Sequence, residues 1–169
     1  MAQQATPATV AQPSPASGGS DRRTTVVVGV DGSDTSWSAL WWACGEAQRL
    51  SGRVIAVYVT CTHEATVASA ALTTGFDAGA YATAAELTHR QQAAELRAKI
   101  QRITAELEIE ISFIHAHGDT AEELLRAAHT THADLIAVGR STKLRHHLAG
   151  SLGRRLARNK KAPIVVIVP

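Results

Sequence analysis

The sequence has 169 residues, of which 45% are hydrophobic, and this size fits one globular domain. Lysine and arginine number 17 against 15 aspartate and glutamate, and a net charge of +2 excludes a strongly basic coat protein for nucleic acid. The charge is unevenly spread, because residues 25–134 carry 7 basic and 14 acidic side chains while residues 135–169 carry 8 basic and no acidic ones. We therefore expect a cationic C-terminal segment on an acidic body.

The first 24 residues are built mainly from Ala, Gln, Pro, Ser, Thr and Gly, with almost no bulky apolar side chain. Such a composition cannot offset the entropy of ordering, so we predict a disordered tail over 1–24 and a folded domain over 25–169. Cys44 and Cys61 have no metal-ligand or disulfide-framework spacing, which favours a reducing compartment. With no export signal and no apolar run long enough to cross a membrane, we expect a cytoplasmic protein with no membrane anchor.

The folded part is predicted to begin with a strand, a turn and a helix. Residues 26–30 form a β-branched run typical of a strand buried on both faces. Asp31 to Ser33 make a turn, and Ser33 or Asp34 can cap a helix that ends before Gly52. Trp42 projects from the opposite side of this helix, as a lone exposed aromatic or as a contact with a later segment or a partner. The predicted buried face consists of Trp37, Leu40, Trp41, Cys44, Ala47 and Leu50.

Strands and helices alternate along the rest of the chain. A strand at 54–59 is followed by a loop at 61–81 of the mobile, functional kind and by an amphipathic helix at 82–107. The next strand holds Ile109, Ile111, Phe113 and Ile114, and a Thr120-x-x-Glu123 capping box opens the helix after it. The last predicted elements are a strand at 134–139, a loop up to Gly150, a helix at 151–160 and a strand at 164–168. The apolar face of the long helix is Ala85, His89, Ala93, Leu96, Ile100, Ile103 and Leu107.

Five strands that alternate with helices predict an α/β fold with a doubly wound parallel sheet. In such sheets a ligand binds outside the carboxyl ends of the strands, where the strand order reverses. If the first and fourth strands are central neighbours, Gly29, Val30 and Asp31 line one side of this crevice and Val138 and Gly139 line the other.

Residues 138–151, VGRSTKLRHHLAGS, place a glycine at a strand end, then a basic loop, then Gly150-Ser151 at a helix start. Free backbone N–H groups and the positive end of a helix dipole favour a phosphate there, and ordinary helix capping explains the same residues equally well. Neither a Walker A motif nor G-x-G-x-x-G is present, so the common phosphate-loop and dinucleotide-binding classes are not supported.

Three segments, VVVGVDGSDTSWSAL, HGDTAEELLRAA and DLIAVGR followed by LAGSLGRRLARNKKAPIVVIVP, together resemble the universal stress protein family. The resemblance spans residues 25–169. It implies an open five-stranded parallel sheet of order 3-2-1-4-5 with helices on both faces, Rossmann-like and similar to the adenine nucleotide alpha hydrolases. It also implies a regulatory module of the bacterial stress response, a homodimer formed through the last strand and, in one branch, ATP, with or without Mg, between strands one and four.

Carried over by position, the resemblance assigns a nucleotide site. Gly29, Val30, Asp31 and Val59 would surround the adenine and ribose, with Asp31 as hydrogen-bond acceptor, while Val138 and Gly139 would pack on the nucleoside and Gly150, Ser151 and Leu152 would meet the phosphates.

The sequence departs from the ATP-binding pattern Gly-x2-Gly-x9-Gly-Ser/Thr of that branch. Thr142 replaces the second glycine, seven residues rather than nine lead to Gly150, and Gly153 replaces a family hydroxyl. These departures favour an alternative function, a nucleotide-free dimeric interaction protein that keeps the fold. Basic side chains on the shortened loop could instead neutralise phosphates, or could simply be solvated: Arg140, Lys143 and Arg145, with His146 and His147.

Other functions have less support from the sequence. The histidine pairs His115/His117, His129/His132 and His146/His147 have no third ligand at fixed spacing, so we expect no metal. Ser151 lacks a nucleophile elbow and an assignable base, so we expect no enzyme, or at most a slow ATPase. The basic C-terminal segment could bind a polyanion, but no aromatic residue follows Phe113, so nucleic acid is not the expected partner.

Overall fold

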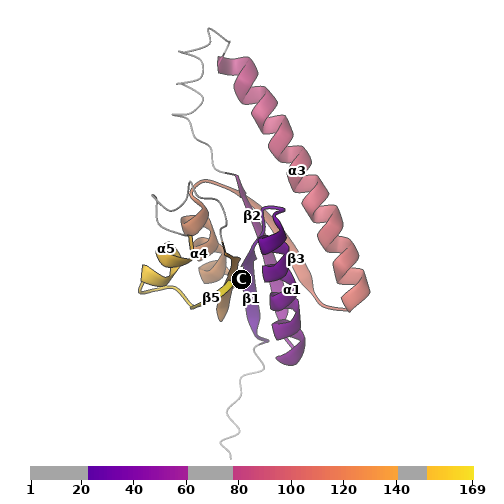
Figure 1. Ribbon diagram of the computed structural model, residues 1–169, viewed down its shortest axis with the longest axis vertical. Coiled ribbons are helices and arrows are strands. Elements are labelled where there is room, and N and C mark those ends of the chain that lie inside the picture. The colour runs from indigo at the N-terminus through magenta and orange to yellow at the C-terminus, as the bar shows by residue number, and fades with distance from the viewer. Residues whose placement is uncertain (1–22, 61–77, 141–151) are drawn as a thin grey trace, which may run out of the picture.

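The computed structural model describes residues 23–60, 78–140 and 152–169 (Figure 1). Residues 1–22 of the predicted tail over 1–24 and residues 61–77 of the predicted loop over 61–81 lie outside the described residues. The strands are β1 (Thr25–Gly29), β2 (Arg53–Thr60), β3 (Ile111–His117), β4 (Leu135–Gly139) and β5 (Ile164–Val168), and the helices are α1 (Asp34–Arg49), α3 (Ala78–Leu107), α4 (Thr120–Thr130) and α5 (Leu152–Arg158).

The strands form one five-stranded sheet of order β3-β2-β1-β4-β5, and all four neighbouring pairs are parallel. This confirms the predicted α/β architecture. The central strand β1 pairs Val27 with Ile55 of β2 and with Ile136 of β4. Val26, Val27 and Val28 are fully buried, because helices cover both faces of the sheet.

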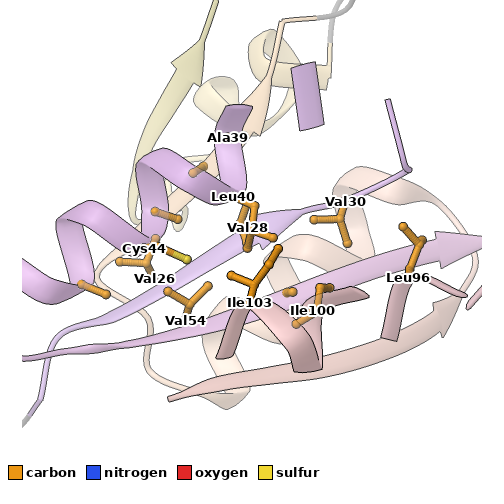
Figure 2. Close-up of a cluster of buried hydrophobic side chains, with 14 of the residues drawn as sticks. Val26, Val28, Val30, Ala39, Leu40, Cys44, Val54, Leu96, Ile100 and Ile103 are labelled. Carbon is orange, nitrogen blue, oxygen red and sulfur yellow. The ribbon is translucent and has the colours of Figure 1, made fainter. Parts of the chain in front are cut away.

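Two hydrophobic clusters lie on opposite faces of the sheet. The first, drawn in Figure 2, packs Leu40 of α1 and Ile100 of α3 against Val26, Val28 and Val54. The second packs Leu124 of α4 and Leu156 of α5 against Val27. Successive β1 side chains enter different clusters, as the period of two in a strand requires.

The buried face of α1 differs from the prediction. Trp41 and Leu50 are 48% and 45% exposed, whereas Trp42 is partly buried against the first cluster. The face on the sheet is made of small residues, which bring the helix axis close to the strands and leave the bulky tryptophans at the flanks. The buried residues are Ser36, Ala39, Leu40, Ala43, Cys44 and Ala47.

The start of α4 also differs by one residue. Its N-cap is Asp119, whose carboxylate accepts hydrogen bonds from the backbone N–H groups of Ala121 and Glu122, so Thr120 is the first helical residue and not the cap. Glu123 is buried and pairs with Arg126 in place of closing a capping box.

Boundaries shift slightly elsewhere. The helix α3 begins at Ala78, within the predicted loop, and β3 begins at Ile111, because Glu108 adopts φ 52° and reverses the chain before Ile109. The predicted buried face of α3 is confirmed at Ala93, Leu96, Ile100 and Ile103. The last strand, β5, has the predicted bounds.

Candidate functional site

The carboxyl ends of β1 and β4 lie side by side at the centre of the sheet. From β1 the chain continues to β2 on one side, and β4 lies on the other, so the strand order reverses between them. A crevice at this reversal is where open parallel sheets bind ligands. The structure thus brings Gly29, Val30 and Asp31 to the same edge as Val138 and Gly139, as the sequence predicts.

Asp31 lies in the turn between β1 and α1, and its hydrogen bonds order that turn. Its Oδ1 accepts from the Ser33 backbone N–H at 2.9 Å and from the Ser33 hydroxyl at 2.5 Å, while its own backbone N–H donates to Ser36 Oγ at 3.3 Å. Gly32 takes φ +84°, a conformation that favours glycine. Asp31 is nonetheless exposed, and carboxylate oxygens are good acceptors for a ligand hydroxyl or amine.

Ser33 is the N-cap of α1 and helps to fix the helix start beside the carboxyl end of β1. Its hydroxyl accepts from the Ser36 N–H at 3.3 Å, and the Ser36 hydroxyl donates back to the Ser33 carbonyl at 2.8 Å. Trp37 adds a hydrogen bond from its indole N–H to the Gly32 carbonyl at 3.2 Å, and the Lys99 ammonium lies 3.9 Å from its ring centroid. The turn is therefore held from both α1 and α3.

Gly139, at the end of β4, packs against the first turn of α1. A Cβ at this position would lie 2.4 Å from the Thr35 carbonyl oxygen and 2.9 Å from the Ser36 backbone nitrogen. The absence of a side chain at Gly139 is thus used by the protein's own backbone, whereas the sequence suggested close approach of a ligand.

The apolar residues assigned to the nucleoside face two directions. Val30 is 3% exposed and belongs to the first cluster, beneath α1 and α3. Val138 is 2% exposed in the second cluster, which Val59 and Leu152 flank as partly buried residues. Val59 and Leu152 therefore keep some surface at this edge, while the Val30 and Val138 side chains are enclosed.

The residues assigned to the phosphates are described only at their margins. Arg140 is exposed, and its backbone N–H donates to the Val168 carbonyl at 2.8 Å, which extends the β4–β5 ladder by one residue. Thr142, Lys143, Arg145, Gly150 and Ser151 lie outside the described residues, as do His146 and His147.

Arg155 of the basic helix α5 has a structural partner. Its guanidinium donates two hydrogen bonds, of 2.9 and 2.8 Å, to the Asp119 carboxylate that caps α4. The Arg155 hydrogen bond, together with the backbone N–H donors of Glu122 and Ala121, holds the pKa of Asp119 below its usual value. This arginine joins α5 to α4.

A polar cluster at the same edge of the sheet was not predicted. At the carboxyl end of β2, the Tyr58 hydroxyl donates to Gln92 Oε1 at 2.9 Å, and Gln92 Nε2 donates to the Asp31 carbonyl at 3.4 Å. Tyr58 also stacks on His115 of β3, with ring centroids 5.2 Å apart, and His115 lies 4.5 Å from the His117 ring. The period of two in His115-x-His117 predicts that both rings share a face, but no sequence signal connects them to Gln92 or Asp31.

The hydroxyl–imidazole contact in this cluster does not resemble a catalytic pair. Thr60 Oγ1 lies 2.7 Å from His115 Nε2, but Thr60 is 3% exposed and so is closed to a substrate. Within residues 23–60, 78–140 and 152–169, no group of three or more His, Cys, Asp or Glu side chains is arranged to hold a metal ion. In the same residues, no helix is at once long enough and apolar enough to cross a membrane.

Comparison with known proteins gives consistent matches. The sequence profile of the Universal stress protein family matches residues 22–168. A universal stress protein of Methanocaldococcus jannaschii is 28% identical over 145 residues, which cover 84% of this chain and 80% of that protein.

Solved structures share the fold. The universal stress protein UspA from Lactobacillus plantarum superposes with a TM-score of 0.66 at 21% identity, over 89% of this chain and 100% of that one. A universal stress protein crystallised in complex with cAMP superposes with a TM-score of 0.63 at 22% identity, over 86% of this chain and 97% of that one.

Proposed function

Because this chain belongs to the universal stress protein family, we propose that it binds an adenine nucleotide in the crevice between the carboxyl ends of β1 and β4. The observation that carries the proposal is the exposed Asp31 carboxylate, fixed by Ser33 at the point where the strand order reverses. The cAMP bound by one structural relative supports an adenine nucleotide as the ligand class.

Within this site, Asp31 accepts hydrogen bonds from the adenine or ribose, and Gly29, Val30, Val59, Val138 and Gly139 border the nucleoside. The phosphates lie toward Gly150, Ser151 and Leu152, where Arg140, Thr142, Lys143 and Arg145 supply donors and positive charge. We assign ATP, with Mg where the phosphates need it, as the physiological nucleotide. The residues named for the phosphates carry no acidic side chain, which suits a polyanionic ligand.

The biological role we propose is that of a cytoplasmic regulatory module of the stress response, not of an efficient enzyme. Rapid ATP hydrolysis needs a positioned water and a general base near the phosphates. The Asp119 carboxylate, which contacts α5, is engaged by Arg155 and is therefore poorly suited to act as that base.

The proposed assembly is a homodimer formed through β5. This strand lies at the edge of the sheet, and Ile164 and Ile167 are 68% and 51% exposed. An exposed apolar edge strand favours pairing with another strand, so a second copy of the chain is a suitable partner.

The second candidate is a dimeric interaction protein that has lost its nucleotide. Thr142 in place of a glycine, and the seven residues between it and Gly150, favour this candidate. It keeps the same β5 dimer, so nucleotide binding and not assembly distinguishes the two functions.

Calorimetric titration of the full chain with Mg-ATP, cAMP and GTP, at moderate and raised salt, tests the proposal. Saturable one-to-one binding of an adenine nucleotide that persists at raised salt supports it. Asp31→Ala is then expected to weaken binding about tenfold or more, since a hydrogen bond to a charged acceptor contributes roughly 1.5–3 kcal/mol. Asp34→Ala is the matched control, because Asp34 is an exposed carboxylate three residues along that begins α1.

Three outcomes overturn the proposal. The absence of binding at millimolar nucleotide would favour the interaction protein. Binding that collapses as salt rises would indicate a nonspecific polyanion surface. Full affinity in both Asp31→Ala and Gly150→Val would place the nucleotide elsewhere.

A further inference from the structure

A row of side chains connects the outer edge of the sheet to the Asp31 turn. Gln92 of α3 bridges two elements, because its Oε1 accepts from the Tyr58 hydroxyl of β2 at 2.9 Å and its Nε2 donates to the Asp31 carbonyl at 3.4 Å. Tyr58 in turn stacks on His115 of β3, with an angle of 28° between the rings. One amide side chain thus links the Asp31 turn, through Tyr58, to a histidine.

His115 lies where a positive charge is poorly tolerated. Burial, and next the neighbouring His117, hold the pKa of His115 below its usual value, and Glu86 opposes this shift. His117 is the nearest ring, with centroids 4.5 Å apart, so two charged imidazoles there would repel each other at close range.

The groups that face His115 come from three elements. On β2 they are Tyr58 and Thr60, and on β3 the group is His117. On α3 they are Glu86, His89 and Arg97, and the Glu86 carboxylate is already engaged by Arg90 at 2.8 Å. His89 Nδ1 is buried and makes no hydrogen bond within the described part of the chain. We call the contact between α3 and β3 around His115 the α3–β3 seam. Because two further imidazoles and an arginine lie near His115, a positive charge on its ring is unfavourable in this seam.

We propose that protonation of His115 loosens the α3–β3 seam, releases the Gln92 bridge from the Asp31 turn and thereby weakens nucleotide binding in acid. The inference rests on the proposed function for its binding step alone. The ring moves away from its charged neighbours, Tyr58 loses its stacking partner, and the 3.4 Å contact to the Asp31 carbonyl is the weakest link in the row. Gln92 acts as a positioning residue, because it touches the turn and not the reacting part of a ligand.

The linkage can be measured without any nucleotide. In ¹⁵N-labelled full-length protein, the Ser33 backbone amide and the Trp37 indole N–H report on the turn, because they donate to Asp31 Oδ1 and to the Gly32 carbonyl. Between pH 8 and pH 5 we expect both signals to shift with the midpoint of the His115 ring, which is followed in the same samples. The dependence should disappear in Gln92→Ala and in Tyr58→Phe, which removes only the hydroxyl.

Gln91→Ala is the matched control, because Gln91 is exposed and, within the described part of the chain, its amide donates a hydrogen bond to the Glu95 carboxylate of the same helix, away from Tyr58 and Asp31. It should keep the pH-dependent shifts of the parent. A His115 titration that leaves Ser33 and Trp37 unchanged, or shifts that persist fully in Gln92→Ala, would overturn the proposed link whatever the protein binds.

The binding step is measured by titrating Mg-ATP at pH 7.5 and pH 5.5. We expect affinity to fall about fivefold in the parent and in Gln91→Ala, the factor that one lost hydrogen bond produces. The affinity of Gln92→Ala for Mg-ATP should be lower than that of the parent at pH 7.5 and should change little with pH. Because protonation of ATP itself affects every variant equally, the comparison with Gln92→Ala also corrects for it. Equal pH dependence in Gln92→Ala overturns the coupling, whereas no binding at either pH refutes the proposed function and leaves the NMR result to decide the link.

Discussion

Gly139 and Thr35 lie so close together that a Cβ on residue 139 would sit 2.4 Å from the Thr35 carbonyl oxygen. The atom in the way belongs to the backbone of the first turn of α1, so it cannot rotate aside. The end of β4 and the start of α1 therefore pack closely against each other. The Asp31 turn directly precedes this first turn of α1.

We expect Gly139→Ala to lower the free energy of unfolding by about 1–3 kcal/mol, because overpacking a fitted contact forces the backbone to shift. Chemical denaturation followed by circular dichroism measures the change. Gly153→Ala is the control, since its Cβ would come close to the Ile167 Cδ1 and Cγ1 atoms, at 2.5 and 2.8 Å, on a half-exposed side chain that can turn away, and would meet Val138 Cγ2 at an ordinary 3.9 Å. Equal losses in the two variants would show that the Thr35 contact is not special.

Asp119→Ala should destabilise the protein by about 1 kcal/mol or somewhat more, because it removes the N-cap of α4 and the partner of Arg155. Asp119→Asn keeps a capping oxygen and loses only the charge, so it should cost clearly less. A matched pair of thermal unfolding curves distinguishes the two contributions, and an Asn variant as unstable as the Ala variant would contradict the capping argument.

The lowered pKa of Asp119 also predicts a direction for the effect of acid. A carboxyl whose folded pKa lies below its unfolded value stabilises the fold above the unfolded value, near 3.9, and loses that contribution as pH falls through the folded pKa. We therefore expect the difference in stability between the parent and Asp119→Asn to shrink below about pH 4. Denaturation midpoints at pH 7, 4 and 3 test this, and a constant difference would refute it.

Cys44 should be inert toward thiol reagents in the folded protein. Burial raises the pKa of its thiol to about 11, so almost no thiolate is present at pH 8, and the side chain is 1% exposed. In a Cys61→Ser background, modification by an aromatic disulfide should be slow under native conditions and fast in denaturant. Rapid labelling of the folded protein would mean that α1 opens frequently from the sheet.

Ile164→Lys should dissociate the proposed dimer without unfolding the chain, because the residue is 68% exposed and faces solvent in the isolated subunit. Light scattering coupled to size-exclusion chromatography gives the mass directly. Trp41→Lys, on an exposed position of α1, is a control for adding a charge in place of an apolar side chain. A parent protein that is monomeric at high concentration would remove the dimer from the proposal.

The sequence alone is enough to predict the order of elements along the chain and the edge of the sheet where the candidate site residues gather. Runs such as Val26 to Val28 are buried on both faces, and this pattern occurs chiefly in parallel sheets, which is why β1 could be placed. Asp31 and Gly139 then follow from the topology, because parallel strands end at the same edge.

Helix faces and long-range polar contacts were harder to predict. Periodicity placed Trp41 on the buried face of α1 and Trp42 on the opposite side, and this was wrong, because the small residues that fit closely to the sheet leave Trp41 exposed and turn Trp42 toward the first cluster. Asp119 and Thr120 can both cap a helix, and only the backbone geometry selects the first. The Gln92 bridge joins residues 61 positions apart, and no local pattern encodes such a contact.

The length of α3 has a consequence for dynamics. The helix has 30 residues, yet over residues 83–107, where burial is described, its buried positions lie only between Ala93 and Ile103, and in Figure 1 its N-terminal turns project beyond the strands. One continuous helix therefore spans two regimes of hydrogen exchange, a slow one where it is anchored on the sheet and a fast one where its amides open without disturbing the core. Gln92 lies at the border between these two regions. Fraying of α3 from its N-terminus that reaches this border therefore disturbs the residue that contacts the Asp31 turn.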